Sequence, residues 1–175
     1  DEFFRVRVAE VRRLISVSSG DARQQSKELL AAIQKGVVEL QKEFDRIYID
    51  IIKGLAARKI YLVNEKQLDE GQAAFVQDYF TSTVLPELEP ILLGEGQAIP
   101  ALNDESIYLA VDIKSGEDYH YAVVEVPTDR LDRFVEIPRK KGKAGKAFIV
   151  LDNIMRACLP QMFRSVLDID RAESY

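Results

Sequence analysis

The stretch IYLAVDIKSGEDYHYAVVEV, residues 107–126, decides the fold class. Its first half alternates, with apolar side chains at Ile107, Leu109, Val111 and Ile113. This period of two is typical of a strand that buries one face. The segment Lys-Ser-Gly-Glu-Asp then turns the chain into a second run that stops before Pro127. We therefore predict an antiparallel hairpin.

Upstream of the hairpin, the apolar side chains follow a helical period. In residues 21–58 they alternate steps of three and four, at Leu30, Ile33, Val37, Leu40, Phe44, Ile47 and Ile51. This is the seam of a helix that packs at a shallow angle against other helices, and at 1.5 Å per residue it would be on the order of 55 Å long. Two more helices are predicted, one over residues 1–15 and one from Asp69, whose spacing to Gln72 is that of a capping box.

The period changes near residues 94–105, where Gly and Pro cluster. We therefore predict an α+β protein with an antiparallel helical bundle over residues 1–95, followed by a partial α+β domain over residues 101–175. Short strands are expected at 134–137 and 147–151, with a helix after them that Pro160 interrupts. Because the first helix opens at Asp1 without an N-cap, we expect the bundle to lack its first helix and the chain to be a fragment of a longer protein.

Composition excludes several classes of protein. The formal net charge is −5, which disfavours a general nucleic-acid binder. One cysteine, Cys158, and one histidine, His120, exclude a disulfide framework and a zinc module. We interpret Cys158 as a small buried apolar residue and His120 as a surface or cross-strand residue. Apolar stretches are far shorter than the roughly 20 residues of a membrane span. We expect a soluble, cytoplasmic protein.

A basic run at residues 139–146 is the main candidate for chemistry. It does not fit a phosphate-binding loop, because Lys140 replaces the first glycine and Ala147 the final Ser or Thr. We favour a solvated loop between two strands, since Gly142 and Gly145 favour mobility. The alternative is a contact with a polyanion through Arg139, Lys140, Lys141, Lys143 and Lys146. Arg5 and Arg7 of the first helix are further candidates for polyanion contacts.

Several segments resemble one family in order along the chain. The most specific are DEFFRVRVAE at residues 1–10 and YAVVEVP at residues 121–127. Others are Gln24-Gln25, Glu43-Phe44, NEKQL at 64–68, Tyr79-Phe80, YLAV at 108–111, Arg133-Phe134, Ile137-Pro138 and IVLDNI at 149–154. Together they cover essentially the whole chain, which resembles bacterial polyphosphate kinase of the phosphohistidine type.

The resemblance implies a magnesium-dependent enzyme that moves the terminal phosphate of ATP onto polyphosphate, reversibly, through a phosphohistidine. Its layout is an amino-terminal helical domain, a head domain and two catalytic domains. This chain would span most of the first domain and the start of the head domain. The family's catalytic histidine and magnesium site lie in the catalytic domains, and its adenine-contacting asparagine would lie two positions before Asp1. We therefore predict no catalytic, cofactor-binding or metal-binding residue here.

The expected role of this part is a wall of the nucleotide site and an assembly surface, inactive alone. The resemblance implies ATP and magnesium as cofactors of the full-length enzyme, and ATP or ADP and polyphosphate as its partners. It also implies a homo-oligomer. The net charge of −5 leads us to expect no nucleic acid among the partners. Two alternatives stay open on residue chemistry: a non-enzymatic helical interaction module, and a local polyanion or nucleic-acid binder that uses residues 139–146.

Overall fold

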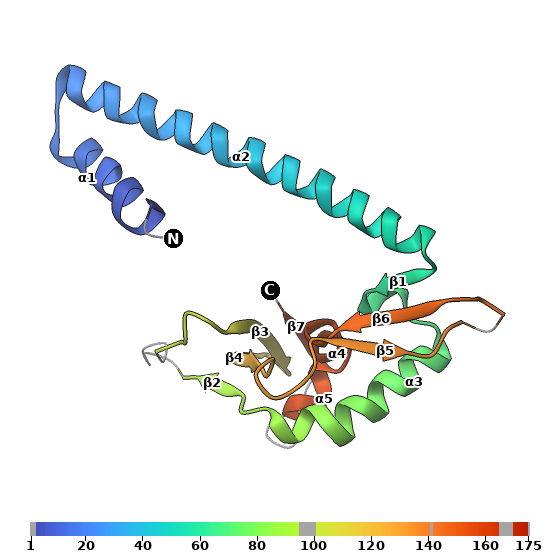
Figure 1. The fold of residues 1–175 in the computed structure, drawn as a ribbon. Helices are drawn as coiled ribbons and strands as arrows, with labels where there is room; N and C mark the ends of the chain where they lie inside the picture. The colour runs from blue at the N-terminus through green and yellow to red at the C-terminus, as the bar shows by residue number, and fades with distance from the viewer. Residues whose placement is uncertain (1–2, 95–100, 141, 165–169, 175) are drawn as a thin grey trace. The chain divides into compact units, whose positions relative to one another are not determined.

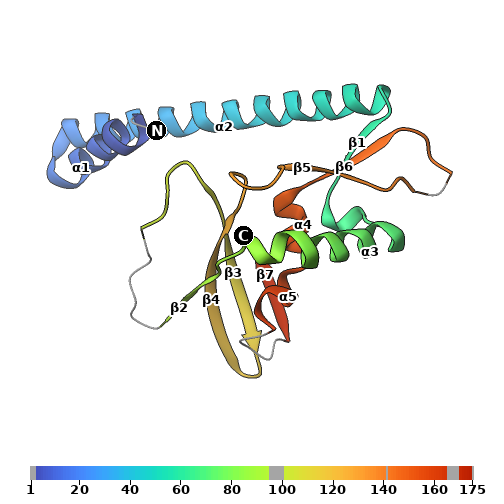
Figure 2. The same ribbon diagram turned by 60° about the horizontal axis from the view of Figure 1, so that its bottom comes forward.

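The computed structural model describes residues 3–94, 101–140, 142–164 and 170–174, and the chain divides into two compact units, Asp1–Gly54 and Leu55–Tyr175. In the first unit, a short π-helical segment η1 (Phe3–Val8) leads into α1 (Ala9–Val17). The long helix α2 (Gly20–Ala57) then runs back beside it (Figures 1 and 2). The predicted helices over residues 1–15 and 21–58 are confirmed in the described part of the chain.

The apolar seam of α2 stays exposed. No residue of α1 or α2 is buried, and Val8 is the buried apolar side chain among the described residues of this unit. Leu40 is 72% exposed and Phe44 69%. The described residues of this unit therefore supply the two antiparallel helices of the predicted bundle but do not cover its seam.

The second unit contains two sheets in its described part. The smaller has the order β1-β6-β5, in which β1 (Ile60–Val63) is parallel and β5 (Phe134–Ile137) antiparallel to β6 (Lys146–Val150). The larger is antiparallel, with the order β2-β4-β3-β7. Its strands are β2 (Ile91–Leu93), β3 (Ile107–Ser115), β4 (Asp118–Val126) and β7 (Arg171–Ser174). The β3–β4 pair confirms the predicted hairpin.

Short helices connect and cover these strands. They are η2 (Glu65–Gln67), α3 (Glu70–Tyr79), η3 (Phe80–Val84), η4 (Leu85–Glu87), α4 (Leu151–Ala157) and α5 (Leu159–Phe163). The break between α4 and α5 falls at Cys158, two residues before Pro160, so the interruption predicted from the proline is confirmed.

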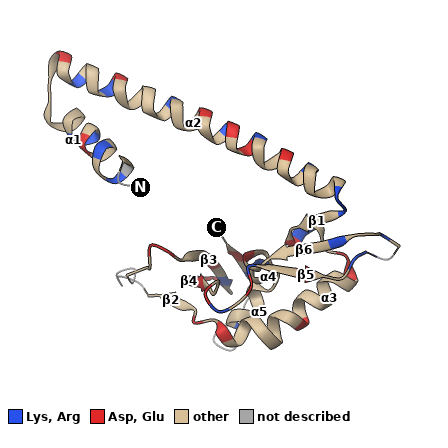
Figure 3. Ribbon diagram, in the orientation of Figure 1, with Lys and Arg blue, Asp and Glu red and all other residues tan. Residues whose placement is uncertain are grey.

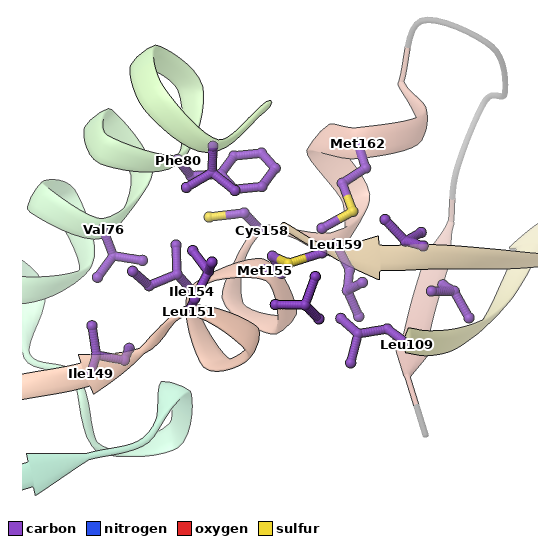
Figure 4. Close-up of a cluster of buried hydrophobic side chains, with 14 of the residues drawn as sticks. Val76, Phe80, Leu109, Ile149, Leu151, Ile154, Met155, Cys158, Leu159 and Met162 are labelled. Carbon is purple, nitrogen blue, oxygen red and sulfur yellow. The ribbon is translucent and has the colours of Figure 1, made fainter. Parts of the chain in front are cut away.

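One apolar cluster joins both sheets to these helices. Val76 and Phe80 from the third helical segment share this cluster with Leu109 of β3, Ile149 of β6 and Met155 of α4, all 1% exposed or less (Figure 4). The third predicted helix therefore packs against strands and belongs to the second compact unit.

This packing differs from the domain division expected from the sequence, 1–95 and 101–175. The compact units divide after Gly54, about 40 residues before the change of period. The physical reason is that periodicity identifies a helix and its buried face, but not what covers that face. The apolar residues of α3 and η3 suit a sheet as well as a bundle.

Two consecutive capping boxes fix the start of α3. Asn64 caps η2 together with Gln67, a capping box that was not predicted. Asp69 caps α3 together with Gln72, as predicted. Gln72 is 1% exposed, and its Nε2 also donates to the carbonyl oxygen of Pro138 at 2.8 Å. This bond ties the N-terminus of α3 to the residues that follow β5.

The strand β1 was not predicted. The sequence showed Ile60–Val63 only as an apolar stretch after a helix, whereas the structure pairs it with β6, from Ile60 opposite Lys146 to Val63 opposite Ile149. Between α2 and β1 the chain turns at Lys59, which has a φ of +61°. A non-glycine residue in this region is uncommon.

Gly145 packs directly against the backbone of Lys59 at this turn. Its φ is +97°, and a Cβ added there would overlap the carbonyl oxygen of Lys59 and lie 2.7 Å from the Lys59 Cβ. Beside it, the backbone N–H of Lys146 donates to the Lys59 carbonyl at 2.9 Å. Gly145 is thus a packing glycine rather than the source of mobility that we expected from the sequence.

We predict that Gly145→Ala lowers the free energy of unfolding by about 2–4 kcal/mol, through a strained φ and overlap with Lys59. Gly142→Ala is the matched control, because Gly142 has a φ of +77° but open space around it. The control should cost only about 1 kcal/mol. Urea denaturation of both variants measures the difference, and equal losses of stability would contradict the packing role of Gly145.

We also predict that Cys158 makes stability fall at high pH. Burial raises the pKa of this thiol from 9.0 to about 11. The neutral thiol therefore stabilises the folded state below pH 9, and this contribution is lost as the pH rises from about 9 to about 11. Urea denaturation at several pH values should show a smaller loss of stability for Cys158→Ala than for the unmodified chain. The same pH dependence in both would refute the prediction.

Candidate functional site

The predicted polyanion contacts fall in both compact units. Arg5 and Arg7 are exposed on η1 in the first unit. The loop between β5 and β6, in the second unit, carries Arg139, Lys140 and Lys143, and Lys146 begins β6. The remaining candidate, Lys141, lies outside the described residues.

The parallel pairing of β1 with β6 adds two cations that sequence reasoning missed. Arg58 and Lys59 immediately precede β1, and Ile60 lies opposite Lys146. Figure 3 shows the basic segments at the starts of both strands and in the β5–β6 loop. We call the exposed residues Arg58, Lys59, Lys143 and Lys146 the cationic edge. No local signal could reveal it, because its halves are more than 80 residues apart in the sequence.

Positive charge is concentrated in the segments that build this sheet. Residues 55–63 and 133–150 contain eight Lys and Arg residues and one acidic residue, Glu136, in a chain of net charge −5. Glu136 accepts from Nζ of Lys146 at 2.9 Å. Within the described part of the chain, the side chains of Lys59 and Lys143 have no hydrogen bond or ion pair. Two of the four cations of the edge, Lys59 and Lys143, are therefore uncompensated among the described residues.

Two of the predicted loop contacts are engaged within the protein. The Arg139 guanidinium lies over the Tyr61 ring, 4.1 Å from its centroid, a cation–π contact, and its Nε is buried without a hydrogen-bond partner in the described structure. Lys140 Nζ donates to the carbonyl oxygen of Gln67 at 3.1 Å. These contacts fasten the start of the loop to β1 and η2.

Beside Arg139 lies a cleft of about 710 Å³. It is lined by Asp69, Glu70, Gly71, Gln72, Pro138 and Arg139. Two carboxylates therefore stand at the N-terminus of α3, where an anion would otherwise bind well. The cleft has mixed charge, and the uncompensated cations lie on the edge instead.

The described residues offer little else for catalysis. His120 lies in β4 opposite Ile113, half-buried, as a cross-strand residue. Within the described ranges no group of three or more His, Cys, Asp or Glu residues could hold a metal ion. The described helices also include none with the length and apolar composition that a membrane crossing requires.

Comparisons with known proteins connect this arrangement to one family. A family model described as the N-terminal domain of polyphosphate kinase matches residues 1–63, and the middle-domain model of the same family matches residues 71–174. The division between the two models places α3 in the middle domain, in agreement with its core contacts.

Individual relatives match the whole chain. A polyphosphate kinase of Vibrio cholerae is 43% identical over 177 residues, covering 100% of this chain and 25% of the relative, and one of Escherichia coli is 36% identical with 100% and 26% covered. The crystal structure of polyphosphate kinase from Porphyromonas gingivalis superimposes with a TM-score of 0.74 at 28% identity, covering 99% of this chain and 26% of that one. The chain spans about a quarter of the length of these relatives.

The resemblance noted in the sequence agrees with three findings: two consecutive domain models, relatives that align with the whole of this chain, and a shared fold. The chain belongs to the polyphosphate kinase family.

Proposed function

We propose that this chain forms the N-terminal quarter of a cytoplasmic enzyme that transfers the terminal phosphate of ATP to polyphosphate. The observation that carries the proposal is the match of the family's N-terminal and middle domains, in that order, over nearly the whole chain. The same order weighs against a free-standing helical interaction module, because such a module would not require the second domain.

Within this enzyme the chain has a supporting role. Phosphoryl transfer depends on positioned cations around the transferred group, and often on a metal ion. The described residues contain no group of three or more His, Cys, Asp or Glu that could hold a metal ion. By the resemblance, we propose that magnesium and the phosphorylated histidine belong to the catalytic domains. By the resemblance, an adenine-contacting asparagine precedes Asp1 by two positions. Arg5 and Arg7 are near that position along the chain, and we propose them as contacts to a phosphate chain.

The proposal predicts different outcomes for the full-length enzyme and for this chain alone. With labelled ATP and magnesium, the full-length enzyme should form labelled polyphosphate, whereas the 175-residue chain should transfer no label to itself or to polyphosphate. His120→Gln in the full-length enzyme should leave the rate unchanged, because His120 is a cross-strand residue of β4. No product from the full-length enzyme would refute the proposed function, and label on His120 would refute the division of roles.

We also propose that the α+β part takes part in self-association. Along β4, Ala122, Val124 and Val126 are buried in the core. The opposite face of the strand, on which Val123 is also only 7% exposed, would normally be polar. Here it carries Tyr119 and Tyr121, 54% and 55% exposed. In the neighbouring strand β2, Ile91 lies opposite Val123 and is 40% exposed. The two exposed tyrosines, whose cross-strand neighbours are Lys114 and Asp112, and Ile91 support a contact between copies of the chain.

Replacing both tyrosines by serine should weaken self-association of the chain at least about tenfold, or about 1.4 kcal/mol. Sedimentation equilibrium at several concentrations measures the dissociation constant. Tyr48→Ser is the control, because Tyr48 is 49% exposed but lies on α2. A chain that is monomeric at every concentration, or a control with the same effect, would contradict the assignment.

A further inference from the structure

We propose that the cationic edge is a binding surface for inorganic polyphosphate, on which successive phosphates lie across the starts of β1 and β6. This inference rests on the proposed function for the identity of its ligand. It assigns a place for the polyanion outside the catalytic domains and adds Arg58 and Lys59, which no sequence pattern indicated. It also reverses our preference for a merely solvated loop.

The backbone beneath the edge is held in place. Lys146 N–H donates to the Lys59 carbonyl, Gly145 packs directly on Lys59, and Lys143 N–H donates to the Lys140 carbonyl at 2.9 Å. Lys140 and Arg139 in turn fasten the loop to Gln67 and Tyr61. A mobile loop would lose conformational entropy when it binds, and a held loop loses less. We expected Gly142 and Gly145 to make the loop mobile and its binding entropically costly. This expectation does not apply to Gly145, because Gly145 is packed against Lys59.

Two lysines of the edge have no internal partner among the described residues. Of its lysines, Lys146 is paired with Glu136, while Lys59 and Lys143 have exposed ammonium groups that make no ion pair among the described residues. In a chain of net charge −5, these two unpaired lysines form a local positive patch that attracts a polyanion.

Lys59 stands where glycine would be less strained. Its φ of +61° follows directly on the C-terminal end of α2, the position that glycine usually occupies. A lysine there accepts backbone strain and adds a cation to the edge. A strained residue of this kind points to a role for its side chain.

The chemistry of the edge favours a phosphate chain over a nucleic acid. Single-stranded nucleic acids are bound with exposed aromatic rings that stack on bases. The nearest tyrosine, Tyr61, is stacked by Arg139 instead, and Phe134 lies opposite Val150, at the far end of β5 from the edge. Three of the four edge residues are lysines, point charges that suit a chain of phosphates without a fixed geometry.

The test is direct binding of end-labelled inorganic polyphosphate to the 175-residue chain, measured by fluorescence anisotropy at two salt concentrations. The variant is Lys59→Gly with Lys143→Gln, in which glycine relieves the strain at position 59. We expect affinity to fall at least about tenfold. The slope of log affinity against log salt concentration should become less negative. For single-stranded polyanions it changes by about 0.7 for each phosphate that is no longer neutralised. Lys143→Gln alone, at an exposed turn, should show a smaller fall in affinity.

The matched control is Lys27→Gln with Lys42→Gln, which removes the same charge from exposed positions on α2. It should bind as the unmodified chain does. Equal affinity of the edge variant and the unmodified chain would overturn the inference, and so would an equal fall in affinity for the edge and control variants. Tighter binding of a labelled single-stranded RNA than of polyphosphate would overturn it as well.

This measurement is independent of catalysis. If the full-length enzyme forms polyphosphate but the edge variant binds it normally, the inference fails and the proposed function stands. If the chain binds polyphosphate through the edge but the full-length enzyme forms no polyphosphate, the proposed function fails. The inference that the edge binds polyphosphate is then still supported.

Discussion

The parallel pairing of β1 with β6 is the constraint on which the second compact unit depends. It connects the end of α2 to a strand that follows more than 80 residues later, and it is closed by the bond from Lys146 N–H to the Lys59 carbonyl. The close approach is possible only because Gly145 has no side chain. A parallel pair needs a long connection. Here that connection contains α3 and the whole β3–β4 hairpin, so most of the second unit lies between β1 and β6 in the sequence.

The shared core explains how two small sheets form one body. Residues of α3, η3, α4 and α5 fill the space between them, so neither sheet has a core of its own. The buried Gln72 adds polar contacts to this packing. Its Oε1 accepts from the Asp69 N–H at the start of α3, and its Nε2 donates to the Pro138 carbonyl. Both the apolar and the polar contacts thereby position the loop that carries the cations.

We propose that this chain contributes surfaces rather than catalytic residues. Its described residues provide the cationic edge, a sheet face with exposed tyrosines and an exposed helical seam. In this proposal the surfaces hold substrate and support assembly, while phosphoryl transfer takes place in the catalytic domains of the family.

The sequence by itself determined the local structure: the period of two in residues 107–126, the period of 3.6 in α2 and the capping box at Asp69 each follow from neighbours a few residues apart. Its ordered motifs also identified the family. Only the tertiary structure decided that α3 packs on strands, that Ile60–Val63 is a strand, and that Lys59 lies against Gly145 and Lys146. These features depend on which distant segments pair, and pairing is set by the complementarity of whole faces, which no local pattern contains.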